Sequence, residues 1–556
     1  MQVELLLLVL SLLFFASIFS DRIGKRYGVP ALLLFMAVGI IFGPEGLGKW
    51  ISEDGVGYIS SISTSSAQAM GTISLCVILF SGGMDTRISD IRPVFGPGGT
   101  LATVGVMLTC LISGTIIYLV LGWVNAIASV GFASALLIAA TMSSTDSASV
   151  FSILRTNRMG LKHNLRPLLE LESGANDPMA YVLTITLIGI VTSHPSSVSA
   201  LEIAQEIVIQ IIVGAVMGFA LGKMAIALMR KVQLTNESLY PIMILTFCIF
   251  IFSVTYYMKG NSFLAVYMGG LMIGNSKFAR KRQTLSFFDG LSWLCQLVMF
   301  LMLGLMVKPH ELVRMEVWLP CLVISFVMIF ISRPLSVFLC LWPFKNYKNS
   351  DKLFVSWVGL KGAVPVIFAI LCMASGVPHA TLLFHIVFLC TIVSLVIQGT
   401  SVSSAARALN LAEPAQERNR ITHFDIELPE DIEAYAREVV VTEQMLERGT
   451  QLKDMNIPDT VRVIMVRRGE NFAVPSGKSE LQKGDIMLVI SEEDIAHVAQ
   501  VQEEEEDYAL NEWGLRFINH TGAFLRERWH NLAEGASAPF RKTKTTDEQK
   551  TDHPNG

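Results

Sequence analysis

Charge is scarce in this sequence. Only 16% of the 556 residues are Asp, Glu, Lys or Arg, whereas 52% are apolar, and the mean hydropathy is positive. A soluble globular domain of this size does not normally have such a composition. The scarcity of charge therefore excludes a soluble protein and indicates a chain that crosses a membrane many times.

Several motifs that would indicate other classes of protein are missing. There is no C-x-x-C, and the eight cysteines all fall within apolar segments, so we expect core residues and not disulfides or metal ligands. There is no TVGYG-like ion filter. The net charge of -4 combines basic inner loops with an acidic region after residue 412, a distribution that gives no support to nucleic-acid binding. Nothing indicates an enzyme or a cofactor.

Apolar runs long enough to cross a hydrocarbon layer of about 30 Å recur from the N-terminus to about residue 408. They predict thirteen membrane spans, of which the second and the ninth are short. The predicted spans are 3–20, 29–43, 67–83, 100–120, 127–154, 165–191, 201–222, 238–258, 263–275, 286–306, 317–342, 353–374 and 380–406.

The loops between these spans predict how the chain is oriented. Lys and Arg concentrate in the loops that follow odd-numbered spans. Because cytoplasmic loops retain positive charge, we expect the N-terminus outside and the C-terminal region in the cytoplasm. The first segment lacks a basic n-region and an A-x-A cleavage site, so we expect a retained span and not a removed leader.

Charged side chains inside the predicted spans are the first candidates for function. An Asp or Lys at the centre of a spanning helix costs about 2.5 to 3.5 kcal/mol, so such residues usually have a partner or a task. The charged candidates are Asp146, Glu172, Asp177, Arg333 and Lys361.

The segment LESGANDPMA, residues 171–180, predicts a binding site for a hard cation. On one helix, Ser173 and Asp177 share a face, while Glu172 and Asn176 share the neighbouring face. Pro178 removes one backbone hydrogen bond and leaves polar backbone beside Asp177. A carboxylate, a hydroxyl and free carbonyls suit Na⁺, K⁺ or H⁺ better than a soft transition metal. The alternative is that these groups only brace the helix bundle.

Glu172 and Arg333 have a different expected role. A buried carboxylate beside a cation site needs a fixed counter-charge, and Arg333 lies near the middle of the eleventh predicted span. We therefore expect a structural ion pair between Glu172 and Arg333 that stabilises the core of the bundle.

Two predicted spans contain polar or helix-breaking stretches. The fifth contains AATMSSTDSASVFSIL, and the twelfth contains GLKGAVPVIFAI. Interrupted spans in corresponding halves are typical of a transporter site, and spans 5 and 12 run in opposite directions, as inverted repeats would require. Asp146 is placed to neutralise half-helix N-termini and Lys361 to neutralise C-termini. Alternatively, Lys361 extends to the cytoplasmic surface.

The motifs LESGANDP, STDS, ISRPL and GLKGAV together resemble those of the NhaP-like branch of the cation/proton antiporters, over essentially all of residues 1–408. The resemblance implies an all-α polytopic membrane protein of the NhaA-like antiporter fold, with about 13 transmembrane helices, inverted repeats and two broken helices. It also implies a homodimer in which a core bundle rocks against a dimerising scaffold, giving alternating access.

The same resemblance implies roles for individual residues. Asp177 would carry cation and proton in turn, helped by Ser173 and by Thr145 through its backbone. Asn176 would replace the second aspartate of electrogenic relatives, which implies electroneutral one-for-one exchange. Two positions depart from the family pattern: Ser147 follows Asp146 where proline is usual, and Lys361 stands where arginine is commoner.

The C-terminal region reads as a small α/β cytoplasmic domain. Short β-rich stretches lie at 437–443, 461–475 and 485–491. The order of residues in GTQLKDMNIPDTVRVIMVRRGENFAVPSGKSELQKGDIMLVI, residues 449–490, resembles a TrkA-C domain, a ligand-sensing module of potassium channels and transporters. No G-x-G-x-x-G precedes it, so an effector such as a nucleotide would bind this domain alone. The predicted divisions of the chain are 1–408 for the membrane domain, 409–426 for a linker, 427–502 for the TrkA-C-like domain, and 503–556 for an acidic run, an amphipathic segment and a disordered tail.

The resemblance to TrkA-C favours K⁺ over Na⁺ as the cation, by association alone. A Na⁺/H⁺ antiporter with the same mechanism and a ligand-gated cation channel are the alternatives. K⁺ or Na⁺, together with H⁺, are the expected transported ions, and the lipid bilayer is the other expected partner. The expected location is the plasma membrane of a bacterium, that is, its cytoplasmic or inner membrane.

Overall fold

Apolar helices dominate residues 30–408 of the protein in a computed structural model. The chain divides into two units, Met1–Gln416 and Glu417–Gly556. The structure describes residues 8, 11–19, 30–43, 45–46, 63–124, 131–157, 159–192, 200–232, 235–278, 280–414, 436–446, 449–455, 457, 461–469 and 471–491. Most of the predicted linker and all of residues 503–556 lie outside these described ranges.

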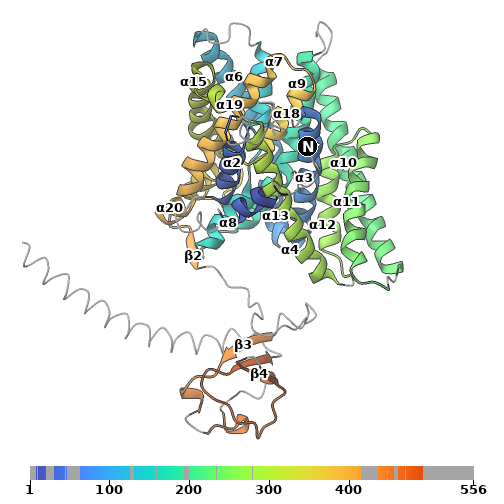
Figure 1. The fold of residues 1–556 in the computed structure, drawn as a ribbon, viewed down its shortest axis with the longest axis vertical. Helices are drawn as coiled ribbons and strands as arrows, with labels where there is room; N and C mark the ends of the chain where they lie inside the picture. The colour runs from blue at the N-terminus through green and yellow to red at the C-terminus, as the bar shows by residue number, and fades with distance from the viewer. Residues whose placement is uncertain are drawn as a thin grey trace, which may run out of the picture. The chain divides into compact units, whose positions relative to one another are not determined.

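The helices of the first unit follow one another along the chain (Figure 1). In its first half they are α2 (Ala31–Ile41), α3 (Thr64–Asp85), α4 (Ile88–Ile91), η2 (Arg92–Val94), α5 (Phe95–Thr100), η3 (Leu101–Gly105), α6 (Val106–Val124), α7 (Phe132–Thr141), α8 (Ser147–Thr156) and α9 (Leu165–Thr192). In its second half they are α10 (Ala200–Lys231), α11 (Leu239–Tyr257), α12 (Ser262–Gly274), α13 (Lys281–Met306), α14 (Pro309–Leu312), α15 (Met315–Phe326), η4 (Val327–Ser332), α16 (Arg333–Cys340), α17 (Asn349–Trp357), α18 (Val364–Ala374), α19 (Ala380–Ser394), η5 (Leu395–Gly399) and α20 (Thr400–Ala408). The segments η3, η4 and η5 are π-helical turns within longer helices.

Among the described residues, eight helices are long and apolar enough to cross a membrane. They are Thr64–Asp85, Ile88–Leu119, Leu165–Thr192, Leu201–Lys231, Leu239–Tyr257, Lys281–Met306, Met315–Cys340 and Ala380–Ala408. Each overlaps one predicted span, and shorter apolar helices lie in the second, fifth, ninth and twelfth. The protein is therefore a multi-pass membrane protein. Part of the first predicted span, 3–20, lies outside the described part of the chain, so the predicted total of thirteen stays a prediction.

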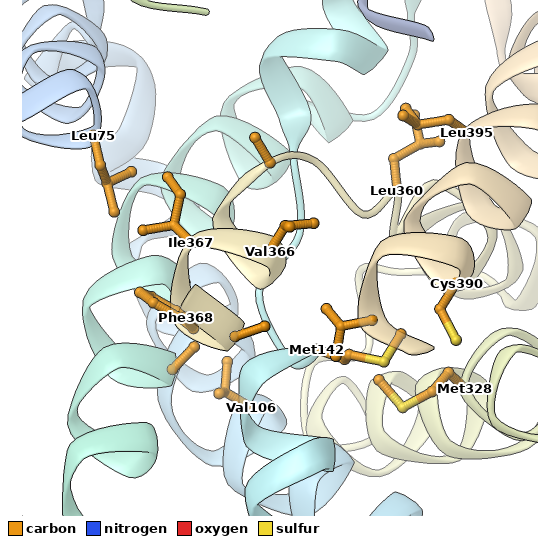
Figure 2. Close-up of a cluster of buried hydrophobic side chains, with 14 of the residues drawn as sticks. Leu75, Val106, Met142, Met328, Leu360, Val366, Ile367, Phe368, Cys390 and Leu395 are labelled. Carbon is orange, nitrogen blue, oxygen red and sulfur yellow. The ribbon is translucent and has the colours of Figure 1, made fainter. Parts of the chain in front are cut away.

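Buried apolar side chains surround the centre of the helical unit. Figure 2 shows Met142, which follows α7, and Leu360, which follows α17, in the same cluster as Val366 of α18 and Cys390 of α19. All eight cysteines are free thiols, and all but the half-buried Cys295 are buried. A packed apolar surround of this kind excludes water from any polar group inside it.

Glycines allow α12 to approach both α3 and α9. A Cβ built at Gly270 of α12 would collide with the backbone carbonyl of Phe80 in α3. A Cβ at Gly174 of α9 would collide with the ring of Tyr267 in α12. Only glycine permits contacts this close. The packing therefore holds α12 directly against the segment of α9 that carries LESGANDPMA.

The chain leaves the helical unit through a small sheet. Strand β1 (Met159–Leu161), in the connection between α8 and α9, pairs antiparallel with β2 (Ala412–Pro414), which follows α20. The register joins Met159 to Pro414 and Leu161 to Ala412.

The second unit contains a four-stranded antiparallel sheet in the order β3-β6-β4-β5. Its strands are β3 (Ala436–Val440), β4 (Val461–Arg468), β5 (Asn471–Ala473) and β6 (Ile486–Ser491). The described helical elements of this unit are the short 3-10 turns η6 (Gln444–Leu446) and η7 (Leu452–Asp454). The three predicted β-rich stretches thus match strands, while residues 492–502 lie outside the described ranges.

Candidate functional site

Two spans are interrupted where the sequence contains its polar and glycine-rich stretches. Residues 142–146 separate α7 from α8, and residues 358–363 separate α17 from α18. The two breaks meet, because the backbone N–H of Asp146 donates to the carbonyl of Leu360 at 2.8 Å. A Cβ built at Gly362 would lie 2.6 Å from Oδ2 of Asp146, so glycine is needed there. Both breaks therefore lie in one place inside the bundle.

Helix α9 holds the first break with side chains from LESGANDPMA. Ser173 Oγ donates to the Thr145 carbonyl at 2.9 Å and accepts from the Ser147 N–H at 3.1 Å. Asn176 Nδ2 donates to Thr145 Oγ1 at 2.5 Å. Thr145 was expected to contribute through its backbone, and its carbonyl is engaged by Ser173 in this arrangement. The polar face of α9 thus satisfies backbone groups that the break leaves without helical partners.

Asp177 is buried at the same break. Ser144 Oγ donates a hydrogen bond to Asp177 Oδ1. Ser144 was missing from the predicted site, although it stands in the predicted polar run beside Thr145. Its position beside Thr145 was the only clue in the sequence. Ser143, Ser144 and Thr145 all carry a hydroxyl, so residue type does not show which of them contacts Asp177. The structure therefore brings the predicted Asp177, Ser173, Asn176 and Thr145 together and adds Ser144.

The proline of α9 provides a contact with α12. Pro178 lies within the helix, and its carbonyl accepts from Asn261 Nδ2 at 2.7 Å. On the other side of Asp177, the ring of Tyr267 covers Gly174. The close approach of a neighbour at this glycine is thus made by α12. Along α9, contacts with α12 and its N-cap residue therefore lie on both sides of Asp177.

Glu172 and Arg333 form a buried ion pair. Arg333 Nη2 lies 2.5 Å from Glu172 Oε1, and the two side chains are 5% and 1% exposed. Arg333 also donates to the Val355 carbonyl at 3.4 Å, and a Cβ at Gly359 would lie 2.9 Å from its Nε. The pair therefore connects α9, which holds the first break, with α17, which ends at the second break.

Asp146 lies at the N-terminus of one helix, and the amine of Lys361 lies near the C-terminus of another. Asp146 caps α8, since its carboxylate accepts from the Ser149 N–H at 3.1 Å and from Ser149 Oγ at 2.5 Å. Lys361 is only 4% exposed, and its Nζ donates to the Ser144 carbonyl at 3.0 Å, just beyond the end of α7. Its amine thus lies inside the bundle and not at the cytoplasmic surface.

Broken helices that meet beside a buried carboxylate define a secondary membrane transporter. A family model for the transmembrane region of sodium/hydrogen exchangers matches residues 9–408, and the chain belongs to this family. A model for the TrkA-C domain matches residues 437–501. Both resemblances noted in the sequence are therefore confirmed.

Known relatives cover most of the chain. It is 37% identical over 494 residues to the K⁺/H⁺ antiporter NhaP of Alkalimonas amylolytica, an alignment that covers 88% of this chain and 81% of the relative. It is 35% identical over 486 residues to the K⁺/H⁺ antiporter NhaP2 of Shewanella sp. (strain MR-4), covering 87% and 81%. The solved sodium proton antiporter MjNhaP1 of Methanocaldococcus jannaschii matches with a TM-score of 0.60 at 23% identity, over 73% of this chain and 99% of that one. That last likeness supports the fold alone.

Proposed function

We propose that the protein is an electroneutral monovalent cation/proton antiporter that prefers K⁺ to Na⁺ and works by alternating access. The observation that carries the proposal is the buried carboxylate of Asp177 beside the two breaks, where its described hydrogen-bond donor is a neutral hydroxyl. Two relatives named as K⁺/H⁺ antiporters favour K⁺, and the match to the sodium/hydrogen exchanger family keeps Na⁺ as the alternative.

The chemistry follows from competition for one carboxylate. Asp177 holds either a proton or a cation, and both occupied forms are neutral at that side chain. The ionised, empty form would lose its hydration without compensation while buried, so it should not change sides readily. Exchange results because only the proton-bound and cation-bound forms of the protein change between the state open to one side of the membrane and the state open to the other.

Oxygen atoms around Asp177 complete the proposed cation site. Ser144 and Ser173 each carry a hydroxyl, and Thr145 adds a carbonyl and a hydroxyl, which are ligand types that hard cations prefer. When a cation displaces the proton, the Ser144 hydroxyl has to turn its lone pairs toward the metal ion. Asn176 supplies a neutral amide where a second carboxylate would add a second exchangeable charge. One proton per cation is therefore the proposed stoichiometry.

The remaining buried charges have supporting roles in this proposal. Glu172 and Arg333 act as a structural ion pair between the helices around the breaks. Asp146 compensates the N-terminus of α8, and Lys361 compensates the carbonyl end beyond α7. None of these four is proposed to carry an ion.

We further propose the arrangement of the whole chain. It has thirteen spans organised as inverted repeats of spans 1–6 and 8–13, with the N-terminus outside, in the inner membrane of a bacterium and as a homodimer. Residues 1–408 form the transport domain and 409–426 the linker. Residues 427–502 form a regulatory TrkA-C domain that binds a small-molecule effector such as a nucleotide, and residues 503–556 follow it.

Flux in proteoliposomes tests the proposed function. An outward K⁺ gradient should drive proton uptake that a voltage clamp leaves unchanged, and Na⁺ should replace K⁺ poorly. Asp177→Asn should abolish the flux, because the amide cannot be ionised. Current that persists in Asp177→Asn would support a channel instead. Repeating the cation series without residues 410–556 tests the regulatory role.

A further inference from the structure

Polar residues in α19 and η5, the span that follows α18, have no role in the function described so far. Thr391 and Ser394 of α19 and Gln398 of η5 recur with helical spacing in an otherwise apolar span, and all three are almost completely buried. Burying an amide side chain is costly unless both of its ends are hydrogen bonded. Gln398 also lies in a π-helical turn, a feature that is often found at functional sites.

Both ends of the Gln398 amide are hydrogen bonded. One end contacts the end of α17, and the other contacts Ser394, which itself bonds to the second break. Its Nε2 donates to the carbonyl of Trp357, the last residue of α17, at 2.7 Å. Its Oε1 accepts from Ser394 Oγ at 2.6 Å. The same Ser394 oxygen accepts from the backbone N–H of Lys361 at 3.0 Å. Two side chains therefore hold the residue that ends α17 and the backbone of Lys361.

These bonds continue to the carboxylate of the proposed site. Lys361 Nζ donates to the Ser144 carbonyl at 3.0 Å, and Ser144 Oγ donates to Asp177. Gln398 is thus linked to Asp177 through Ser394, Lys361 and Ser144, by hydrogen bonds between these residues and by the covalent structure of Lys361 and Ser144 between those bonds. A shift of the second break would move the Lys361 amine and, with it, the segment that presents the Ser144 hydroxyl.

The neighbouring threonines, the buried Thr391 and the exposed Thr400, show what an ordinary hydroxyl does in this span. Thr391 Oγ1 donates to the Val387 carbonyl at 2.9 Å, and Thr400 Oγ1 donates to the Val396 carbonyl at 2.6 Å. Both bonds stay within the threonine's own helix, four residues back. Gln398 instead reaches a different span. Simple satisfaction of a buried polar group therefore does not account for its choice of partner.

We propose that Gln398 and Ser394 are positioning residues for cation/proton exchange, which hold the second break so that Lys361 and Ser144 are correctly placed around Asp177. They are the counterparts of Asn176 and Ser173, which hold the first break from α9. This inference rests on the proposed antiport function. It adds two residues that act on the ion only through others.

The test measures K⁺/H⁺ exchange by the full chain in proteoliposomes for Gln398→Met, Ser394→Ala and the control Thr391→Val. Gln398→Met keeps the side-chain length but removes both hydrogen bonds. We expect its apparent KM for K⁺ to rise about 10-fold, the size typical of losing a group that orients an ion ligand, and its pH profile to shift. Ser394→Ala should change the same two quantities, and Thr391→Val neither.

Gln398→Glu provides a conditional rescue. A protonated glutamic acid can donate to the Trp357 carbonyl and accept from Ser394, whereas the carboxylate can only accept. Relative to wild type at each pH, this variant should approach normal exchange at acidic pH and lose it at alkaline pH.

Two results would overturn the inference. In the first, Gln398→Met and Ser394→Ala both have the same apparent KM for K⁺ and the same pH profile as the control Thr391→Val. The other is a Gln398→Glu variant whose relative activity does not depend on pH. If the wild-type protein fails to exchange K⁺ for H⁺ at all, the proposed function fails and takes this inference with it. Normal wild-type exchange with unaffected variants removes the inference alone.

Discussion

The two broken helices are held by the same kinds of side chain, but only one of them has a carboxylate beside it. In each, a following helix supplies a hydroxyl and an amide that satisfy the break: Ser173 and Asn176 for the first, Ser394 and Gln398 for the second. Only the first of these helices carries a carboxylate next to its amide, namely Asp177. The comparison teaches that holding a break open and binding an ion at it are separable tasks.

Charge compensation is also unequal between the two breaks. Asp146 caps α8, and the Lys361 amine, although it belongs to the second break, extends to a carbonyl of the first. At the second break, the charged Arg333 contacts the Val355 carbonyl within α17, whereas the neutral Gln398 serves the last residue of α17, and α18 begins without a side-chain cap. Fixed charges therefore converge on the break where ions are proposed to bind.

The largest expected effect comes from breaking the ion pair that connects α9 with α17. Glu172→Gln leaves Arg333 as a buried charge without its counter-ion, which typically destabilises a protein by about 3 to 5 kcal/mol. Thermal unfolding of the purified protein should show the loss, together with lower exchange. The double variant Glu172→Met with Arg333→Met should recover much of the stability, since no buried charge remains. Equal stability of Glu172→Gln and wild type would contradict the structural role of the pair.

The inequality of charge between the breaks predicts a second, smaller effect. Lys361→Met removes a charged donor from the Ser144 carbonyl, and hydrogen bonds to charged groups contribute about 1.5 to 3 kcal/mol, so exchange should fall about 10- to 100-fold. Asp146→Asn should cost less, because asparagine caps a helix nearly as well as aspartate. Initial rates in proteoliposomes check the order of the two variants. A greater loss in Asp146→Asn would reverse the proposed assignment.

The smallest expected effect concerns an ion pair outside the membrane, which contrasts with Glu172 and Arg333. In the second unit, Arg468 Nη2 lies 2.6 Å from Oδ2 of the buried Asp485, and its hydrogen bonds hold the pKa of that carboxyl below the ordinary value. Because the folded pKa is the lower one, the pair stabilises the unit above the unfolded pKa of about 3.9 and loses this contribution as pH falls through the folded pKa.

Hydrogen exchange of peptides from β4 and β6 checks this expectation in the full chain. Arg468→Met should reduce their protection at neutral pH, and the difference from wild type should disappear in strong acid. Lys483→Met is the matched control, because its pair with Glu443 is mostly exposed and should contribute little. A difference that persists unchanged in acid would show that Arg468 acts through packing and not through charge.

Much of the helical unit could be predicted from hydropathy and from the scarcity of charge. The buried charges mark the site because each is costly in a membrane, and the two interrupted spans follow from glycine, proline and clustered hydroxyl residues. Span boundaries were less accurate: the fourth was predicted from residue 100, whereas the helix extends back to Ile88. Asp90, Arg92 and the GPGG stretch lower the hydropathy of that first part without preventing the helix.

Ser144 and Gln398 show why the rest of the site was not predictable. Which of Ser143, Ser144 and Thr145 faces Asp177 depends on the path of a non-helical segment, and residue type does not determine that path. Gln398 lies far along the chain from Trp357, and its helical spacing with Thr391 and Ser394 does not indicate which backbone group this polar face holds. Contacts between breaks required the three-dimensional arrangement of the two halves.

Proton release on cation binding tests the central claim most directly. Purified protein in a weakly buffered solution is titrated with K⁺ while a pH indicator and calorimetry report protons released and ions bound. At a pH where Asp177 carries its proton, one proton should leave for each K⁺ bound, and Asp177→Asn should release none. Wild-type protein that binds K⁺ without releasing protons at any pH, or Asp177→Asn that releases them normally, would contradict it.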